Sequence, residues 1–169
     1  MQGKSVEFGK LVHNPQSKYA TPKLMDVRKQ YGEVVAESFL QIQIADAFNQ
    51  LGMNVADKVT SSQNVVLSIR HYGERLMLAE WLIVFHRLKN DEEVRANYNQ
   101  ANFVSRLKKC INEVVCESSK ERDRLAKEEE KQSREEIYAR IKSGELSIAD
   151  YDVELREKEK EITNKYFNY

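Results

Sequence analysis

Residues 76–88 read LMLAEWLIVFHRL, the most hydrophobic stretch of the chain, and they decide how the rest of it folds. Only Glu80, His86 and Arg87 are strongly polar here, so a helix formed by this stretch is apolar on nearly every side. A helix of that kind belongs in the middle of a bundle. We therefore predict a central helix over residues 76–88, with Trp81 inside the core.

Amphipathic segments flank this stretch on both sides. Apolar residues recur at three- and four-residue steps over residues 24–31, 33–51, 60–72 and 101–115, which is the pattern of helices with one buried face. The predicted inward residues are Leu24, Val27, Tyr31, Val34, Val35, Phe39, Leu40, Ile42, Ile44, Phe48, Leu51, Val65, Val66, Ile69, Tyr72, Phe103, Leu107, Cys110, Ile111, Val114 and Val115. Only six glycines and two prolines interrupt the 169 residues, too few for the turns of a sandwich or barrel. The sequence predicts an all-α fold.

Capping residues mark where these helices begin and end. Thr21 before Pro22 predicts a helix start, Gly52 predicts a helix end, and the run Thr60–Ser62 predicts a further start. Residues 89–100 are polar and rich in turn-forming residues, so we expect a connection there.

The composition changes after Cys116. Residues 1–116 carry 15 basic and 12 acidic side chains, whereas the 53 residues that follow carry 12 and 15, so half of them are charged. No large apolar side chain lies between Ala126 and Ile137, which a two-stranded coiled coil could not tolerate. Acidic residues four positions before basic ones support a solvated helix instead, and the pairs are Asp123–Lys127, Glu130–Arg134 and Glu136–Arg140.

The end of the chain predicts a helical hairpin. Gly144 predicts the end of the charged helix, and Ser147 with Asp150 resembles a capping box that opens a returning helix. Leu146 and Tyr151 stand where a hydrophobic staple would join. The stripe Ile148, Tyr151, Leu155, Ile162 and Tyr166 is predicted to meet Ile137, Tyr138 and Ile141.

The predicted architecture is therefore an all-α helical bundle with a long charged C-terminal helical arm that ends in a helical hairpin. Its four regions are an N-terminal tail (1–20), the bundle (21–116), the charged arm (117–143) and the returning helix (144–169).

Two sets of side chains are candidates for binding. Exposed aromatic residues on a charged arm are a liability without a partner, so the hairpin predicts a protein-docking surface. The candidate partner-binding residues are Tyr138, Ile141, Leu146, Tyr151, Leu155, Ile162, Tyr166, Phe167 and Tyr169. Basic residues close to tyrosines can bind the phosphates of nucleic acid. The candidates for this are Lys23, Arg28, Lys29, Arg87, Lys89, Arg95, Arg106, Lys108 and Lys109.

The sequence shows no motif for catalysis or for binding a metal or a cofactor. It contains no catalytic constellation, phosphate loop or metal-ligand spacing, so we expect no enzyme activity, no metal and no cofactor. Cys110 and Cys116 are expected to be buried free thiols. Glu80, inside the central helix, needs a neutralising cation, and the candidates are Arg70, Arg75 and Lys89. No stretch resembles a signal peptide or a membrane span, so we expect a cytoplasmic protein without a membrane partner or small-molecule substrate.

A resemblance adds to this reading. Residues 69–72 read IRHY and residues 78–89 read LAEWLIVFHRLK, a block similar to one in small helical proteins of phages and integrated mobile elements, some of replicative helicase-loader type. The resemblance covers residues 24–112 and implies a helical bundle whose arm engages a replication partner such as a replicative helicase, without catalytic residues. The chain departs from the pattern at residues 90–95, where NDEEVR replaces a link rich in glycine and tyrosine. The hairpin resembles short helical oligomerisation modules of bacterial proteins.

These observations lead to one functional hypothesis and two alternatives. The leading hypothesis is a non-enzymatic helical adaptor of a phage or mobile element that acts in DNA replication as a helicase loader or regulator. The first alternative is a structural protein that self-assembles through the C-terminal hairpin. The second is a nucleic-acid-binding module that uses the basic residues.

Overall fold

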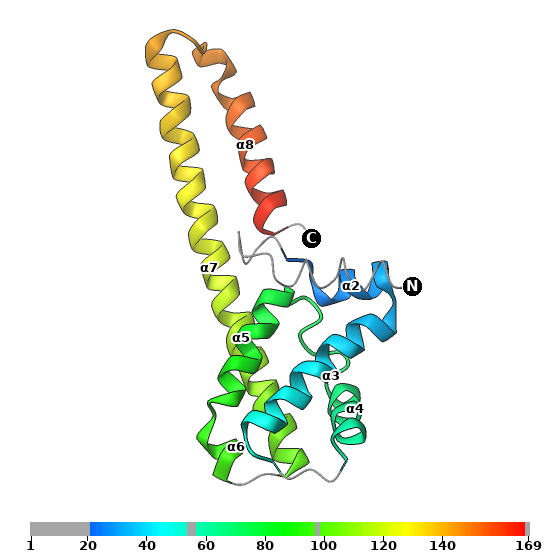
Figure 1. Ribbon diagram of the computed structural model, residues 1–169. Helices are drawn as coiled ribbons and strands as arrows, with labels where there is room; N and C mark the ends of the chain where they lie inside the picture. Colours follow the sequence, from blue (N-terminus) through cyan, green and yellow to red (C-terminus); the bar gives the residue numbers. More distant parts are fainter. Residues whose placement is uncertain (1–20, 54–56, 97–98, 168–169) are drawn as a thin grey trace. The chain divides into compact units, whose positions relative to one another are not determined.

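The chain is built from helices (Figure 1). The structure is a computed structural model that describes residues 21–53, 57–96 and 99–167. Its helices are α2 (Leu24–Tyr31), α3 (Glu33–Gln50), α4 (Lys58–Ser68), α5 (Leu78–Lys89), α6 (Glu92–Ala96), α7 (Gln100–Ser143), the 3-10 turn η2 (Ile148–Asp150) and α8 (Tyr151–Tyr166). No strand occurs in the described ranges, and the only β feature there is an isolated bridge between Lys23 and Met77. The all-α prediction is confirmed.

The chain divides into two units, Met1–Val115 and Cys116–Tyr169. The change in composition after Cys116 lies beside this boundary. Helix α7 contributes residues to both units and has the length expected from the sequence, since it ends at Ser143. The first unit is called the bundle below, and the second the hairpin.

Helix α5 forms the centre of the bundle, as its composition predicts. Leu78, Trp81, Val84, Phe85 and Leu88 have at most 1% of their surface exposed. The rings of Trp81 and Phe85 stack with their centroids 5.7 Å apart. Helix α3 packs against α2, α4 and α5, so the apolar faces of these helices enclose one core.

The first turns of α2 and α5 complete each other's hydrogen bonding. The backbone N–H groups of Leu24 and Met25 donate to the carbonyls of Leu76 and Glu74 at 3.1 and 3.0 Å, and Leu78 N–H donates to Pro22 O at 3.0 Å. The hydroxyl of Thr21 accepts from Ala79 N–H at 3.2 Å. Helix starts leave N–H groups without intrahelical partners, and here each helix start supplies acceptors for the other. The prediction that Thr21 caps its own helix is wrong, because it caps α5, 58 residues further along.

Gly73 closes the turn that leads into α5. Its φ of 67° lies in the left-handed region, which favours glycine. A Cβ at this position would lie 2.7 Å from Cζ2 of Trp81 and 3.2 Å from Cγ2 of Ile111. The backbone of the turn is therefore packed directly against side chains of α5 and α7.

Several residues predicted to face the core are exposed. Val34 and Ile42 on α3 are 76% and 64% exposed, and Tyr72 and Val115 are also exposed. On α3 the buried positions include the small residues Ala36 and Ala47. Apolar residues are so frequent along α3 that they fit more than one buried face of the helix. The prediction also did not place the alanines in the core, although small residues permit close packing of helices.

Two helix starts differ from the sequence prediction. Helix α4 is capped by Asp57, whose carboxylate accepts from the backbone N–H of Thr60 at 3.0 Å, and not by the run Thr60–Ser62. Residues 92–96 form the short helix α6 where a connection was expected. Asp91 Oδ1 accepts from Glu93 N–H at 3.0 Å, and Val94 is buried. The side chains of Asp57 and Asp91 thus fix where α4 and α6 begin.

None of the described helices combines the length and the apolar character needed to cross a lipid bilayer.

Replacing Trp81 by alanine should destabilise the bundle by about 3–5 kcal/mol, because it empties the centre of a packed core. The measurement is urea unfolding followed by far-ultraviolet circular dichroism, since Trp81 is the single tryptophan. The expected result is a much lower midpoint. An unchanged midpoint would show that α5 is not the centre of the fold.

Replacing Thr21 by valine should lower the stability of the bundle by about 0.5–2 kcal/mol, because α5 loses the acceptor for its second N–H group. Thr163→Val is the matched control, since that hydroxyl only donates to a carbonyl within its own exposed helix. Equal unfolding midpoints for the two variants would contradict the capping role of Thr21.

Candidate partner-binding hairpin

The candidate phosphate-binding residues form two groups along the chain, and the first, Lys23, Arg28 and Lys29, is largely occupied within the bundle. Lys23 is only 5% exposed. Arg28 forms ion pairs with Glu33 and Glu74, the latter at 3.3 Å. The hydrogen bonds from Arg28 and from Arg70 lower the pKa of Glu33 to about 2. Lys29 is exposed.

The second group comprises Arg87, Lys89, Arg95, Arg106, Lys108 and Lys109, and two of these side chains pair with carboxylates. Arg106 pairs with Asp91 at 2.9 Å and with Glu93 at 2.8 Å, and Lys89 pairs with Asp46. Its other members are placed as follows: Arg95 donates to the carbonyl of Lys89, Lys108 lies 4.4 Å from the ring centre of Tyr72, and Arg87 and Lys109 line a hollow of about 410 Å³. Ion pairs with carboxylates thus reduce the positive charge that Arg28, Lys89 and Arg106 can offer to phosphates.

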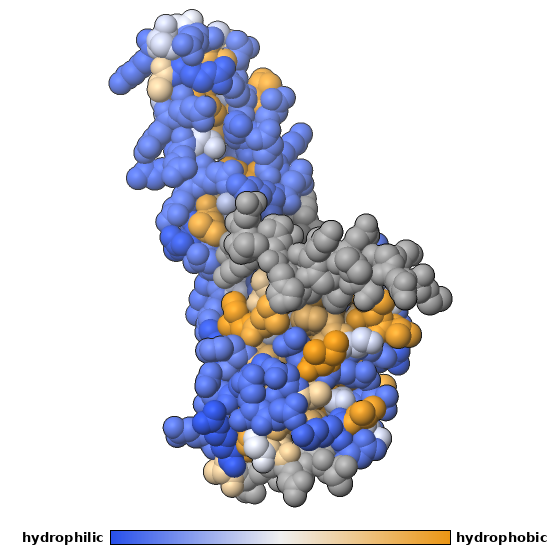
Figure 2. Space-filling model, viewed as in Figure 1, coloured by the Kyte–Doolittle hydropathy of each residue, from blue (hydrophilic) through white to orange (hydrophobic). Residues whose placement is uncertain are grey.

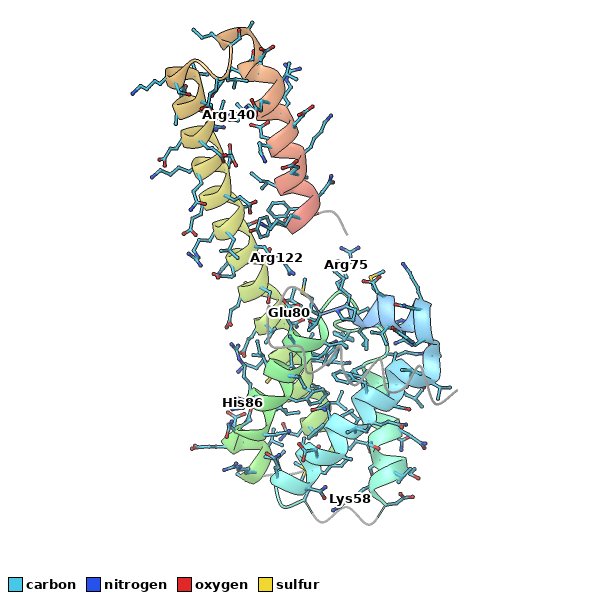
Figure 3. The ribbon with its side chains drawn as sticks, turned by 45° about the horizontal axis from the view of Figure 1, so that its top comes forward. Lys58, Arg75, Glu80, His86, Arg122 and Arg140 are labelled. Atoms are coloured by element: carbon cyan, nitrogen blue, oxygen red, sulfur yellow. The ribbon has the colours of Figure 1, made fainter. Side chains whose placement is uncertain are left out.

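No group of three His, Cys, Asp or Glu residues is arranged to hold a metal ion in the described ranges. Cys110 is buried, which raises the pKa of its thiol, whereas Cys116 is exposed, contrary to the prediction. His86 lies at the exposed edge of α5 (Figure 3).

Glu80 is fully buried on α5 (Figure 3), and one of its carboxyl oxygens bonds to the backbone. Its Oε2 accepts a hydrogen bond from the backbone N–H of Met77 at 2.9 Å. Two of the three predicted cation partners are engaged elsewhere, because Arg70 pairs with Glu33 and Lys89 pairs with Asp46. The carboxylate therefore serves the start of its own helix, as the acid of a capping box does.

The hairpin is formed by α8 and the part of α7 that follows Val115 (Figure 1). Gly144, with a φ of 79°, ends α7, and the N–H groups of Glu145 and Leu146 both donate to the carbonyl of Arg140. The hydroxyl of Ser147 accepts from Ala149 N–H at 3.1 Å. Ser147 thus caps η2, one turn before α8, and not α8 itself as the capping-box pattern predicted.

The apolar core of the hairpin is thin. Its buried apolar side chains are Ala126, Ile137 and Ile162. The rings of Tyr138 and Tyr151 are 5.4 Å apart, which joins the two helices near the turn. The remaining described candidates Ile141, Leu146, Leu155 and Tyr166 are half-buried, and Tyr169 and the predicted tail 1–20 lie outside the described residues. Ile148, predicted to face inward, is 79% exposed because it belongs to η2 and not to α8.

Charged groups connect the two helices of the hairpin. Glu129 accepts hydrogen bonds from Lys165 at 2.7 Å and from the hydroxyl of Tyr166 at 2.8 Å. Arg140, near the closed end (Figure 3), pairs with Glu154 across the hairpin and not with Glu136 along its own helix. The predicted pair Glu130–Arg134 is present at 2.5 Å. Four-residue spacing could not predict the pairs that join the two helices, because the partners are 14 to 37 positions apart in the sequence.

Two hollows run between the helices of the hairpin. One, of about 380 Å³, is called the Phe167 groove and is lined by Asp123, Ala126, Lys127, Glu130, Glu159, Ile162, Thr163 and Phe167. The other, of about 490 Å³, is called the Glu129 groove and is lined by Leu125, Glu128, Glu129, Gln132, Ser133, Glu136, Lys158, Glu161, Ile162, Lys165 and Tyr166. In the view of Figure 2 the hairpin surface is mostly hydrophilic, with separate hydrophobic residues between polar ones. The only large exposed aromatic groups of the described hairpin are Tyr138 and Phe167, which are 57% and 48% exposed.

The sequence predicted the aromatic residue of the Phe167 groove but not the charged residues that line its sides. Asp123, Lys127 and Glu130 were predicted only as members of charge pairs along one helix, and Ala126 and Glu159 were not singled out. The available signal was the position of Ala126, a small residue at an inward position in an otherwise ionic stretch.

Comparisons of the chain with known protein families, with curated proteins and with solved structures found no match. The resemblance to phage and mobile-element proteins therefore stays a prediction. What the geometry offers is a pair of helices with exposed aromatic groups and shallow grooves, which suits the binding of another polypeptide.

Acidification should weaken the contact between α7 and α8 because it protonates Glu129. The hydrogen bond from Lys165 is the main cause that lowers the pKa of Glu129 from its ordinary 4.5. Because the pKa is lower in the folded state, the stabilisation is complete above pH 4.5 and is lost as the pH falls through the lowered value. Protection of the α8 amides against hydrogen exchange should decrease over that range.

Glu129→Gln should weaken this protection at pH 7 and flatten its dependence on acid. Glu157→Gln, an exposed change on α8, is the control and should keep the wild-type profile. Identical profiles for both variants would exclude Glu129 as the group that closes the hairpin.

Proposed function

We propose that the chain is a non-enzymatic helical adaptor of a phage or mobile element that binds a protein partner through its hairpin. A replicative helicase is the first partner to test, because the resemblance of residues 24–112 is to proteins of helicase-loader type. The observation that carries the proposal is the hairpin itself, which projects aromatic groups from a helix pair with very little apolar core.

A partner would supply what this hairpin lacks. Ala126, Ile137 and Ile162 bury little apolar surface, and ion pairs between exposed side chains add only about 0–1 kcal/mol each. Helix pairs of this kind gain stability when a third element covers them. Tyr138 and Phe167 are of the residue type that dominates binding energy at protein interfaces.

The bundle supports the role of a scaffold. Its core is continuous, and its helix starts and turns are fixed by backbone hydrogen bonds and packing. The pairing of Arg28, Lys89 and Arg106 with carboxylates favours a protein partner over nucleic acid as the ligand.

The test is co-purification of the replicative helicase of the same genetic element with the full-length chain. Two variants accompany it, namely a chain that ends at Cys116 and the full chain with Ile137→Asp and Ile162→Asp, which removes the hairpin core. We expect capture by the wild type and loss with both variants, while Trp81 fluorescence confirms that the bundle stays folded. Equal capture by all three, or by none, would contradict docking through the hairpin.

A further inference from the structure

We infer that the Phe167 groove binds an amphipathic helix of a partner that carries basic side chains along its edges. The inference rests on the proposed function, since it names the chemistry of the partner that docks on the hairpin. Its three supports are the shape of the groove, the aromatic group at its end and the charge of its walls.

The shape of the groove suits a third helix. Two antiparallel helices leave a groove along their line of contact, and a further helix lays its side chains into it. Ala126 and Ile162 form the floor, and both are 7% exposed, so apolar atoms are within reach from outside. The side chain of Ala126 is a single methyl group, so a helix bound in the groove could approach the backbone of α7 closely at this position.

Phe167 provides an apolar contact at one end of the groove. It follows the last residue of α8, and 48% of its surface is exposed although it lines the groove. An aromatic ring in this position can cover an aliphatic side chain of the incoming helix without reorganisation of the hairpin backbone.

The walls of the groove favour a basic ligand. The groove is lined by three acidic residues, Asp123 and Glu130 on α7 and Glu159 on α8, and by one basic residue, Lys127. Arg134 contacts Glu130 at 2.5 Å and Glu159 at 3.8 Å, and even with this arginine the carboxylates outnumber the cations. A helix with lysines or arginines on its two edges would meet acidic residues on both walls, which directs its orientation.

The same charges argue against a second copy of the hairpin as the occupant. Residues 117–169 carry 15 acidic and 12 basic side chains, so each hairpin as a whole has a net charge of −3. Association of like-charged surfaces is disfavoured.

The Glu129 groove is a poorer site because its polar groups already bond to one another. Lys165 and Tyr166 bind Glu129, and Lys158 binds Glu161 at 3.1 Å. A ligand there would have to break these contacts, some of which hold α8 against α7. The Phe167 groove is crossed only by the 3.8 Å contact of Arg134 with Glu159 among the ion pairs of the described residues.

The test uses the full chain and synthetic amphipathic helical peptides with leucines on one face. One peptide carries lysines on both edges, and the second carries glutamates in their place. We expect the lysine peptide to bind with an affinity that falls as salt is raised, and the glutamate peptide not to bind. Binding is measured by fluorescence anisotropy of labelled peptide.

Matched variants separate the groove from general electrostatic attraction. Asp123→Lys with Glu159→Lys reverses one acid on each wall, and Glu135→Lys with Glu157→Lys makes the same charge change at exposed positions that do not line the groove. The groove variant should weaken lysine-peptide binding by about tenfold or more, and the control variant should change it little. Phe167→Ala should also weaken binding, whereas Val153→Ala, a loss of an apolar group exposed elsewhere on α8, should not.

Three outcomes would overturn the inference. Equal weakening by both charge variants would mean attraction without a site, and the absence of lysine-peptide binding would mean that the groove takes no basic helix. Sedimentation tests the remaining occupant, because a wild-type dimer that dissociates in the groove variant would place a second copy there. If the groove fails while helicase capture still requires the hairpin, the proposed function stands; if the groove binds while capture does not require the hairpin, the proposed function falls alone.

Discussion

The reciprocal hydrogen bonding between the starts of α2 and α5 is the contact on which the bundle depends. It satisfies N–H groups that would otherwise be buried without acceptors, and it places α5 so that Trp81 packs beneath the turn at Gly73. Once α5 is fixed, α3 can pack against it, and the remaining helices cover the core. Apolar burial then supplies most of the stability of this unit.

The hairpin depends on different physics. Its helices are joined by few apolar contacts and by pairs such as Glu129–Lys165 and Arg140–Glu154. Charged contacts between exposed side chains are weakened by salt and by acid, whereas the burial of Trp81 is not. In the function that we propose, this weakly closed helix pair binds the partner helix and the packed bundle is the scaffold.

Local sequence patterns predicted the helices but not the contacts that join distant parts of the chain. The period of apolar residues located α3, α5 and α7, and Gly52 and Gly144 marked helix ends, because these features act within a few residues. Thr21 and Arg140 were assigned to the nearest helix although their partners lie across the fold. Spacing along one helix cannot reveal such partners.

The candidate site was predicted in part for the same reason. Its aromatic members, Tyr138, Tyr151 and Phe167, are conspicuous in an ionic stretch. Asp123 and Glu159 gain meaning only when two helices bring them to one groove, and a charged residue on an isolated helix looks like any other.

The most direct test of the two-unit account is urea unfolding of the wild-type chain, observed at once by Trp81 fluorescence and by far-ultraviolet circular dichroism. Trp81 reports the bundle alone, while circular dichroism also reports the hairpin. The account predicts that part of the helical signal is lost before the fluorescence changes, and that added salt moves only this early step. Coincident transitions that salt does not separate would contradict it.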